Sequence, residues 1–386
     1  MKGIASLLLA TVLALLAGCD RDGGSSTSST APQGASGGAS AGTSAGPSAG
    51  SATVASSSTG ASVGLTGAGS TFVKPLMDKW SSEYPKSHPG FRLNYQGIGS
   101  GGGIKQISER TVDFGATDGP MTDGQLKKAS GEILHIPVTM GAVVPIYNLP
   151  QVKKSLVFSG PVLADLFLGK INKWNDPRLV ELNPDAGLPD EPVTIVHRSD
   201  GSGTTYIFTD YLAKVSKDWA GGPGKATTVN WPVGRGAKGN DGVAGDVKQN
   251  QGSLGYVELI YAANNNITYG DVQNAAGKPV HASEQSVSAA AGALKTIPPD
   301  LRVSITNVEG DNAYPISGFV WVLVYKEQSD AAKGQATVDF LWWATHEGQA
   351  MAAPMHYAPL PAEFIPLVEG KLSSVTAGGK SLHAPK

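Results

Sequence analysis

Three glycine-rich turns contain the residues of this sequence that could do chemistry. Their sequences are Gly67-Ala68-Gly69-Ser70-Thr71-Phe72, Gly97-Ile98-Gly99-Ser100-Gly101-Gly102-Gly103 and Asp200-Gly201-Ser202-Gly203-Thr204. Each turn precedes a segment with a helical pattern, so its glycines allow close backbone approach and its serine or threonine can cap the helix. The start of a helix presents unpaired amides and a partial positive charge, which attract an anion. Three such turns in one chain, the last preceded by Arg198, predict a site where helix starts converge on a small tetrahedral anion.

Other kinds of site fail on the spacing of their residues. A Walker P-loop requires Gly-x-x-x-x-Gly-Lys-Ser/Thr, which none of the glycine runs supplies. Ser202 sits between a strand and a helix, like the serine of a nucleophile elbow, but positions 200 and 204 are not glycine. The 7 histidines are scattered without a His-Glu-x-x-His pattern. We therefore expect no catalytic residues, no metal and no cofactor.

The elements that must position these turns alternate along the chain from Leu65 onward. Strand-like stretches alternate with amphipathic segments, which is the pattern of an α/β fold. Phe72, Leu76, Trp80 and Tyr84 recur every four residues and predict one apolar helical face. Further helices are expected near 104–107, 162–167, 206–215 and 338–344, and strands at 92–96, 112–116, 133–147, 193–197 and 318–325.

Length and charge limit the fold and its partners. At 386 residues the chain is long enough for a sizeable core, and two domains are expected. Hydrophobic residues make up 40% and the net charge is −2, as in an ordinary soluble protein. A nucleic-acid-binding protein needs a basic face, so nucleic acid is not an expected partner. A small anion remains compatible, because a few backbone amides and one arginine bind it locally.

The first residues resemble a lipoprotein signal peptide followed by a tether. Lys2 precedes an apolar stretch, Ile4 to Ala17, that is too short to span a bilayer comfortably. The stretch ends in a sequence resembling a lipobox, whose Cys19 is the only cysteine of the chain. We therefore expect residues 1–19 to be a signal peptide and Cys19 to be lipidated. Residues 20–62 are rich in Ser, Ala, Gly and Thr, which predicts a flexible tether.

Seven stretches, spread over the chain, carry a resemblance to a known family. They are Leu65-Thr66-Gly67-Ala68-Gly69-Ser70-Thr71-Phe72, Asn94-Tyr95-Gln96-Gly97-Ile98-Gly99-Ser100, Val112-Asp113-Phe114-Gly115-Ala116-Thr117-Asp118, Leu168-Gly169-Lys170-Ile171-Asn172-Lys173-Trp174, Arg198-Ser199-Asp200-Gly201-Ser202-Gly203-Thr204, Gly239-Asn240-Asp241-Gly242 and Gly255-Tyr256-Val257-Glu258. In this order, over the chain from Leu65 to about Leu367, they resemble the phosphate-binding lipoproteins of bacterial ABC importers (PstS family). The sequence departs from the family at Val73, where proline is frequent, and at Gly101, where serine is common.

The resemblance implies an α/β fold of the periplasmic-binding-protein kind (type II). Two domains would be joined by two crossover strands, with the ligand in the cleft between them. Domain I would comprise residues 63–143 and 312–370, and domain II residues 144–311. Residues 371–386 would form a polar tail that frays. Because each domain would hold half of the ligand, binding would favour closure of the cleft.

The resemblance also implies which residues bind phosphate. The expected ligands are Thr71, Phe72, Ser100, Asp118, Arg198, Ser202, Gly203 and Thr204, supported by Asp200 and Ser70. An ionised Asp118 can only accept hydrogen bonds, so it suits an anion that carries a proton. Phosphate carries one, whereas sulfate near neutral pH does not. Asp200 would fix the fork of Arg198, whose head can bind two anion oxygens at once.

The expected function is capture of inorganic phosphate and its delivery to the permease and ATPase subunits of a phosphate ABC importer. The protein would be a monomer, anchored by lipid on Cys19 to the outer face of the cytoplasmic membrane, in the periplasm of a Gram-negative cell. Three alternatives stay open. They are hydrolysis of a phosphate ester, binding of sulfate or molybdate, and an adhesion role that the tether would permit. The first lacks a general base placed by spacing, and Asp118 argues against the second.

Overall fold

The computed structural model of the chain describes residues 62–382. The expected signal peptide, Cys19 and the tether up to Ala61 lie outside those residues, as do the last four positions of the chain. Within the described part, no helix combines the length and the apolar character needed to cross a membrane.

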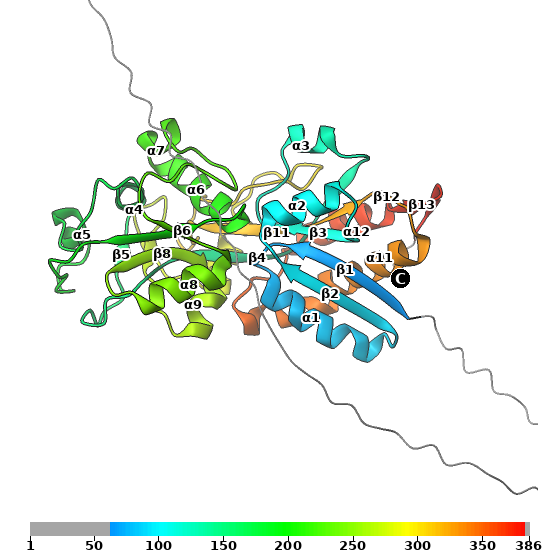
Figure 1. The fold of residues 1–386 in the computed structure, drawn as a ribbon, viewed down its shortest axis with the longest axis horizontal. Coiled ribbons are helices and arrows are strands. Elements are labelled where there is room, and N and C mark those ends of the chain that lie inside the picture. Colours follow the sequence, from blue (N-terminus) through cyan, green and yellow to red (C-terminus); the bar gives the residue numbers. More distant parts are fainter. Residues whose placement is uncertain (1–61, 383–386) are drawn as a thin grey trace, which may run out of the picture. The chain divides into compact units, whose positions relative to one another are not determined.

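An eight-stranded mixed sheet forms the centre of this part of the chain, with the strand order β2-β1-β3-β11-β4-β8-β6-β7 (Figure 1). Its strands are β1 (Val63–Gly69), β2 (Phe91–Gly97), β3 (Phe114–Thr117), β4 (Ile133–Tyr147), β6 (Thr194–Arg198), β7 (Arg235–Ala237), β8 (Ser253–Glu258) and β11 (Ser317–Tyr325). β1, β2 and β3 are parallel to one another, and so are β6, β7 and β8. The strands expected at 92–96, 112–116, 133–147, 193–197 and 318–325 are confirmed, with bounds shifted by one or two residues.

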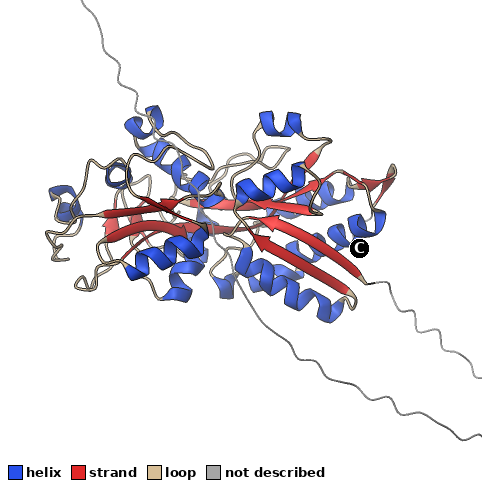
Figure 2. Ribbon diagram, viewed as in Figure 1, coloured by secondary structure: helices blue, strands red, loops and turns tan. Residues whose placement is uncertain are grey.

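Helices cover the strands, as Figure 2 shows above and below the sheet. They are α1 (Lys74–Ser87), α2 (Ser100–Ser108), α3 (Asp123–Lys128), α4 (Gly160–Phe167), α5 (Pro177–Leu182), α6 (Gly203–Val215), α7 (Lys217–Gly221), α8 (Gly239–Gln249), α9 (Leu259–Asn265), α10 (Glu284–Gly292), α11 (Ala331–Thr345) and α12 (Ile365–Ser373). Short 3-10 turns follow α11 at η1 (Glu347–Met351), η2 (Ala353–Met355) and η3 (Ala362–Phe364).

β4 links the two halves of the sheet because its first part pairs with one strand and its last part with another. Residues 133–142 of β4 pair with β11, whereas Val143 to Tyr147 pair with β8. All fifteen residues of β4 are buried, because helices or other strands cover both of its faces. The change of partner, between Ala142 and Val143, falls one residue before the boundary that the sequence predicts between residues 143 and 144. The division into domains itself stays a prediction.

The apolar face predicted for the first helix is buried as expected. Leu76, Trp80 and Tyr84 lie on α1 and are almost completely covered, and the indole of Trp80 donates to the Gly348 carbonyl oxygen at 2.9 Å. Phe72 is also buried, but α1 begins after it, at Lys74. Burial of such large side chains contributes about 1.5–3 kcal/mol each to folding. This contribution anchors the turn that leads into α1.

The tail after Gly370 does not fray within the described residues, so this expectation is wrong. Leu372 lies on α12, which ends at Ser373, and two short strands follow that helix, β13 (Thr376–Ala377) and β14 (Lys380–Ser381). β13 pairs with both β14 and β12 (Glu327–Gln328). Apolar side chains hold the tail in place: Leu372, Val375 and Leu382 are buried in the core, although polar residues dominate the composition of the tail. A second small sheet joins β5 (Val157–Phe158), β9 (Asp271–Gln273) and β10 (Pro279–Val280).

Candidate functional site

The carboxyl ends of the parallel strands all face the middle of β4. β1, β2 and β3 approach it from one half of the sheet, and β6, β7 and β8 run in the opposite direction from the other half. In open α/β sheets, ligands bind outside the carboxyl ends of the strands, where the strand order switches. The predicted site residues follow those ends: 70–72 after β1, Ser100 after β2, Asp118 after β3, and 198–204 at the end of β6.

Two of the three glycine turns touch each other at this point. The amide of Gly101 donates to the Gly201 carbonyl oxygen at 2.8 Å, which joins the start of α2 to the turn before α6. Gly99 has a φ of +90°, and a Cβ built on it would overlap the Asp200 carboxylate. Glycine is required there on both counts. Gly101 itself, where the sequence departs from the family that it resembles, takes part directly in this contact.

Asp118 lies at the centre of the cluster and is 1% exposed. The Ser100 hydroxyl donates to its Oδ1 at 3.2 Å, and the Thr204 hydroxyl donates to its Oδ2 at 3.3 Å. These two donors come from opposite halves of the sheet. Gly203 packs so closely on Asp118 that a side chain at position 203 would overlap the carboxylate.

Burial dominates the protonation of Asp118. It raises the pKa of Asp118 from the ordinary 3.8 to about 6, against the opposing influence of Ser70, the charge of Arg198, Ser100 and Thr204. Keeping the carboxylate ionised in this environment of low polarity therefore costs free energy. A group placed this way is a marker of a functional site.

Arg198 and Asp200 form a bidentate pair beside Asp118. Arg198 donates to Asp200 through Nε at 2.7 Å and through Nη2 at 2.5 Å, and its side chain is 1% exposed. Its Nη1 donates to the Thr204 hydroxyl at 3.3 Å. Burial alone would raise the pKa of Asp200, but Arg198 and the Gly239 amide, which donates to Oδ1 at 3.0 Å, lower it below the ordinary value. Three of the five guanidinium N–H groups are thus engaged, leaving two for an anion.

Backbone amides complete the set of donors. Among the described residues, the amides of Thr71, Phe72, Gly203 and Thr204 have no acceptor. This is expected for Gly203 and Thr204, the first residues of α6, whereas Thr71 and Phe72 lie in the turn before α1. The Ser202 hydroxyl accepts from the Thr205 amide at 3.0 Å and caps α6. Its proton remains free to donate. The cluster therefore offers amides, hydroxyls and a guanidinium as donors around a single buried acceptor, which suits an anion that carries one proton.

The sequence suggested that a serine or threonine side chain caps each of the three helices, and the structure corrects this expectation. Only α6 is capped in this way, by Ser202. The N-cap positions of α1 and α2 are Val73 and Gly99, and neither makes a side-chain hydrogen bond there. Ser70 reaches the Val73 amide from three residues away, at 3.3 Å. At the start of α2 the Gly101 amide is taken by the Gly201 carbonyl oxygen, whereas the turn before α1 leaves the Thr71 and Phe72 amides without an acceptor among the described residues.

Three tyrosines that the sequence analysis missed orient the turn before α1. The hydroxyls of Tyr95, Tyr261 and Tyr357 donate to the carbonyl oxygens of Ser70, Thr71 and Phe72, respectively. In a planar trans peptide, the N–H points away from the C=O, so fixing each carbonyl also fixes the next amide. The tyrosines thereby aim the Thr71 and Phe72 amides. No local signal marks these contacts, because each tyrosine lies far away in the sequence.

A fourth helix start, that of α8, also reaches the cluster and was not predicted. Gly239 opens α8 with a φ of +72° and donates to Asp200, and Asn240 donates to both Thr71 and Thr204. The stretch from Gly239 to Gly242 carried the family resemblance but was given no role in the site. A glycine between a strand and a helix, the pattern that marked the other three turns, could have indicated this helix start.

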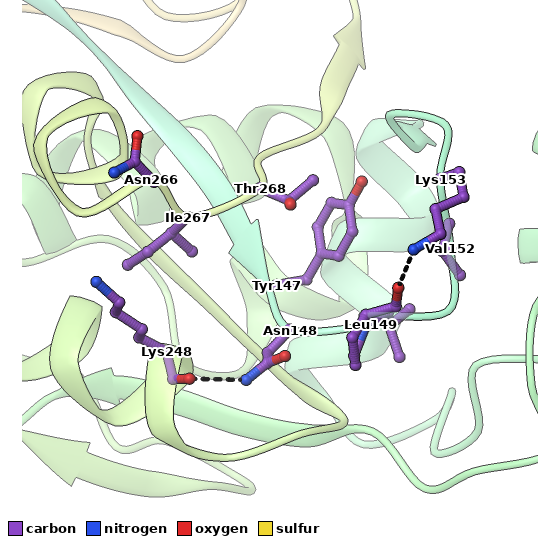
Figure 3. Close-up of a pocket in the computed structure, with 10 residues that line it drawn as sticks. Tyr147, Asn148, Leu149, Val152, Lys153, Lys248, Asn266, Ile267 and Thr268 are labelled. Atoms are coloured by element: carbon purple, nitrogen blue, oxygen red, sulfur yellow. Dashed lines mark hydrogen bonds between the residues drawn. The ribbon is translucent and has the colours of Figure 1, made fainter.

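A separate pocket of about 390 Å³ lies beside the end of β4. It is lined by Tyr147, Asn148, Leu149, Pro150, Val152, Lys153, Lys248, Asn266, Ile267 and Thr268. Figure 3 shows Lys153 and Lys248 on different sides of Tyr147, and the Asn148 amide bonded to the Lys248 carbonyl oxygen at 2.9 Å. None of the predicted site residues lines this pocket.

Within residues 62–382, no group of three or more His, Cys, Asp or Glu side chains could hold a metal ion.

The raised pKa of Asp118 predicts how stability depends on pH. The folded protein holds this proton more tightly than the unfolded chain, so the stabilisation is complete below pH 3.8 and is lost as the pH rises through about 6. The free energy of unfolding should fall by about 3 kcal/mol over this range relative to Asp118→Asn, which has no proton to lose. Urea unfolding of both proteins between pH 3.5 and 7 measures this difference. Two parallel curves would contradict the protonation described here.

Comparison with known proteins gives a consistent set of matches. A profile of the PBP superfamily domain matches residues 39–345. The phosphate-binding protein PstS of Xylella fastidiosa (strain Temecula1) is 45% identical over 324 residues, covering 83% of this chain and 88% of that protein. The phosphate-binding protein PstS of Pasteurella multocida is 43% identical over 322 residues, covering 82% and 93%.

Among solved structures, the phosphate-binding protein of Stenotrophomonas maltophilia superposes with a TM-score of 0.62. It is 17% identical, and the match covers 80% of this chain and 93% of that one. At this identity the likeness concerns the fold alone. It agrees with a periplasmic-binding-protein fold for the described residues, as the resemblance implied.

Proposed function

The chain belongs to the PstS family of phosphate-binding proteins, and on that premise we propose that the cluster around Asp118 is where it holds inorganic phosphate. The protein is a substrate-binding component of a phosphate ABC import system and not an enzyme. The proposed ligands are those the sequence implied: Thr71, Phe72, Ser100, Asp118, Arg198, Ser202, Gly203 and Thr204, with Asp200 and Ser70 in support.

One observation carries the assignment of the site: a single buried acceptor stands among many donors. Asp118 is 1% exposed, and serine, threonine, arginine and free amides surround it. The donors match the oxygens of a phosphate, and Asp118 matches its hydroxyl. An anion without a proton would face the carboxylate with no hydrogen bond to offer it. This arrangement favours phosphate over sulfate and molybdate.

We further propose that the two halves of the sheet, residues 63–143 with 312–370 and residues 144–311, act as two domains that close on phosphate. The ligands divide between them, with Thr71, Ser100 and Asp118 on one side and Arg198 and Thr204 on the other. β4 would serve as one crossover, and the chain entering β11 as the other. Closure would bring both sets of donors onto the anion and exclude water from it.

The lipobox-like sequence supports a proposed location at the outer face of the cytoplasmic membrane. Cys19 would carry the lipid, and residues 20–62 would tether a monomeric binding domain close to the permease and ATPase subunits. A tether of about forty small residues has a root-mean-square reach of roughly 35 Å. That reach would keep the loaded domain near its transporter while letting it turn.

Replacing Cys19 with serine tests the anchor. The variant should move from the membrane fraction to the fluid outside the cytoplasmic membrane, because no acyl chain can be attached to serine by the same route. Fractionation of cells that produce each protein, followed by immunoblotting, measures the distribution. The control is Ser25→Ala in the tether, which should leave the protein with the membrane. Equal membrane fractions of wild type and of a Cys19→Ser protein whose size on the blot shows that its signal peptide has been removed would refute lipid anchoring at this residue.

Calorimetric titration of the purified, ligand-stripped protein with phosphate and then with sulfate tests the binding function. The expected result is tight one-to-one binding of phosphate and no heat from sulfate. Binding of both anions would remove the proposed role of Asp118 while keeping the site. No heat from either anion would reject the cluster as an anion site.

A further inference from the structure

Asn240 is buried where the two halves of the candidate site meet. It is the second residue of α8, it is 0% exposed, and every polar atom of its side chain has a partner. Its Nδ2 donates to the Thr71 hydroxyl oxygen at 2.9 Å and to the Thr204 hydroxyl oxygen at 3.2 Å. One amide group thus spans from the turn before α1 to the first turn of α6.

The orientation of this amide follows from its third partner. The backbone N–H of Glu258, at the end of β8, points at Asn240 Oδ1 at 3.1 Å. A backbone N–H can only donate, so the atom that it meets must be the amide oxygen. The NH₂ group is therefore the one that faces the two threonines.

Asn240 determines that the Thr71 hydroxyl acts as a hydrogen-bond donor. Thr71 Oγ1 accepts from Asn240 twice, from Nδ2 at 2.9 Å and from the backbone amide at 3.3 Å. A hydroxyl has two lone pairs and one proton, so both acceptor positions of Thr71 are filled. The only hydrogen bond left to Thr71 is one that it donates.

The same reasoning holds for Thr204. Its Oγ1 accepts from Asn240 and also from Arg198 Nη1 at 3.3 Å, and arginine cannot accept. The Thr204 proton is thereby directed at an acceptor, which in the described structure is Asp118 Oδ2. Asn240 thus sets the Thr71 hydroxyl as a donor by itself, and the Thr204 hydroxyl together with Arg198.

We propose that Asn240 is a positioning residue for phosphate binding: by donating to Thr71 and Thr204, it fixes both hydroxyls as hydrogen-bond donors toward the anion. This inference rests on the proposed phosphate site. Asn240 acts through the threonines, and its contribution is to affinity. In the described structure the Thr71 hydroxyl donates to no other group, so it needs no reorientation when the anion arrives, and Thr204 has only to turn its proton from Asp118 to the anion. Because both hydroxyls are held as donors, less entropy is lost on binding.

The substitution Asn240→Asp tests the proposal with little change in shape. The aspartate keeps an oxygen for the Glu258 amide, but when ionised it accepts hydrogen bonds from the threonines instead of donating to them. Their protons would then turn away from phosphate. We expect the Kd for phosphate, measured by calorimetry, to rise at least about 100-fold for Asn240→Asp and about 10-fold for Asn240→Ala.

The matched control is Asn183→Asp. Asn183 is also a buried asparagine, its Oδ1 accepts from the Val157 amide at 2.8 Å, and its Nδ2 donates to the carbonyl oxygens of Val157 and Leu179. It lies at the end of α5, away from the predicted ligands. This variant should lose thermal stability while its phosphate Kd stays within about twofold of wild type.

A double-mutant cycle separates positioning from mere support of the fold. Thr71→Val keeps the shape of the side chain and removes its hydroxyl. If Asn240 acts through that hydroxyl, the loss caused by Asn240→Ala should shrink at least about threefold in the Thr71→Val background. Additive losses would overturn the proposal, and so would an unchanged Kd in both Asn240 variants. If wild type itself fails to bind phosphate, the proposed function fails instead, so the two failures are distinguishable.

Discussion

Replacing Asp118 with asparagine is expected to reduce the preference for phosphate over sulfate by at least about 100-fold. The wild-type carboxylate accepts a hydrogen bond from a protonated anion and repels one that has no proton. Asparagine carries no charge, and its NH₂ group can donate to a sulfate oxygen. A buried site built to bond one hydroxyl can reject an analogue lacking it by about 10⁴-fold, and that discrimination depends on the acceptor. Phosphate itself should bind more weakly as well.

Calorimetry with both anions on wild type, Asp118→Asn and Asp118→Ala measures this change. Asp123→Asn is a suitable control, because the Asp123 side chain is 76% exposed and pairs with Arg302 at 2.8 Å. It should leave both affinities unchanged. Selectivity that survives in both Asp118 variants would mean that another group distinguishes an anion that carries a proton from one that does not.

Replacing Arg198 with alanine is expected to cost about 2–5 kcal/mol of phosphate binding, which corresponds to about a 30- to 5,000-fold loss of affinity. Two effects add. The anion loses the free N–H groups of a buried guanidinium, and Asp200 loses the partner that offsets its charge. An unbalanced carboxylate beside the anion would repel it. Arg198→Lys should recover only part of the loss, because an ammonium cannot hold Asp200 with two bonds and still present a fork.

Lys105→Ala is the matched control for the arginine. Lys105 lies on α2, only five residues after Ser100, but its side chain is 73% exposed and its 3.9 Å pair with Glu109 is on the surface. Removing it should change the Kd by less than about twofold at physiological salt. Comparable losses in Arg198→Ala and Lys105→Ala would place the anion elsewhere on the protein.

Much of the fold could be predicted from the sequence, because its strongest patterns are local. The fifteen-residue apolar run of β4 is buried along its whole length, and the four-residue spacing of Leu76, Trp80 and Tyr84 gives the buried face of α1. The tail was misjudged because its composition is polar on average. Among its described residues, Leu372, Val375 and Leu382 are buried in the core, and a composition average does not show where single side chains point.

The candidate site was predictable to the extent that its residues lie in short motifs. The glycine turns, Asp118 and the Arg198–Asp200 pair are all read from neighbouring positions, and the structure brings them together. The supporting contacts are not local: Asn240 meets Thr71 across 169 positions, and Tyr357 meets Phe72 across 285. Such pairs are set by the order of the strands. Without an expected register for the whole sheet, the sequence does not indicate which asparagine or tyrosine will arrive at the site.

The contact between Gly101 and Gly201 limits how the chain can evolve. It consists of backbone atoms alone, and a Cβ on either residue would lie 3.0 Å from the Cα of the other. Mutation cannot trim such a contact but can only add atoms to it, which would push the two turns apart by a few tenths of an ångström. A side chain at either position therefore enlarges the separation between the start of α2 and the turn before α6.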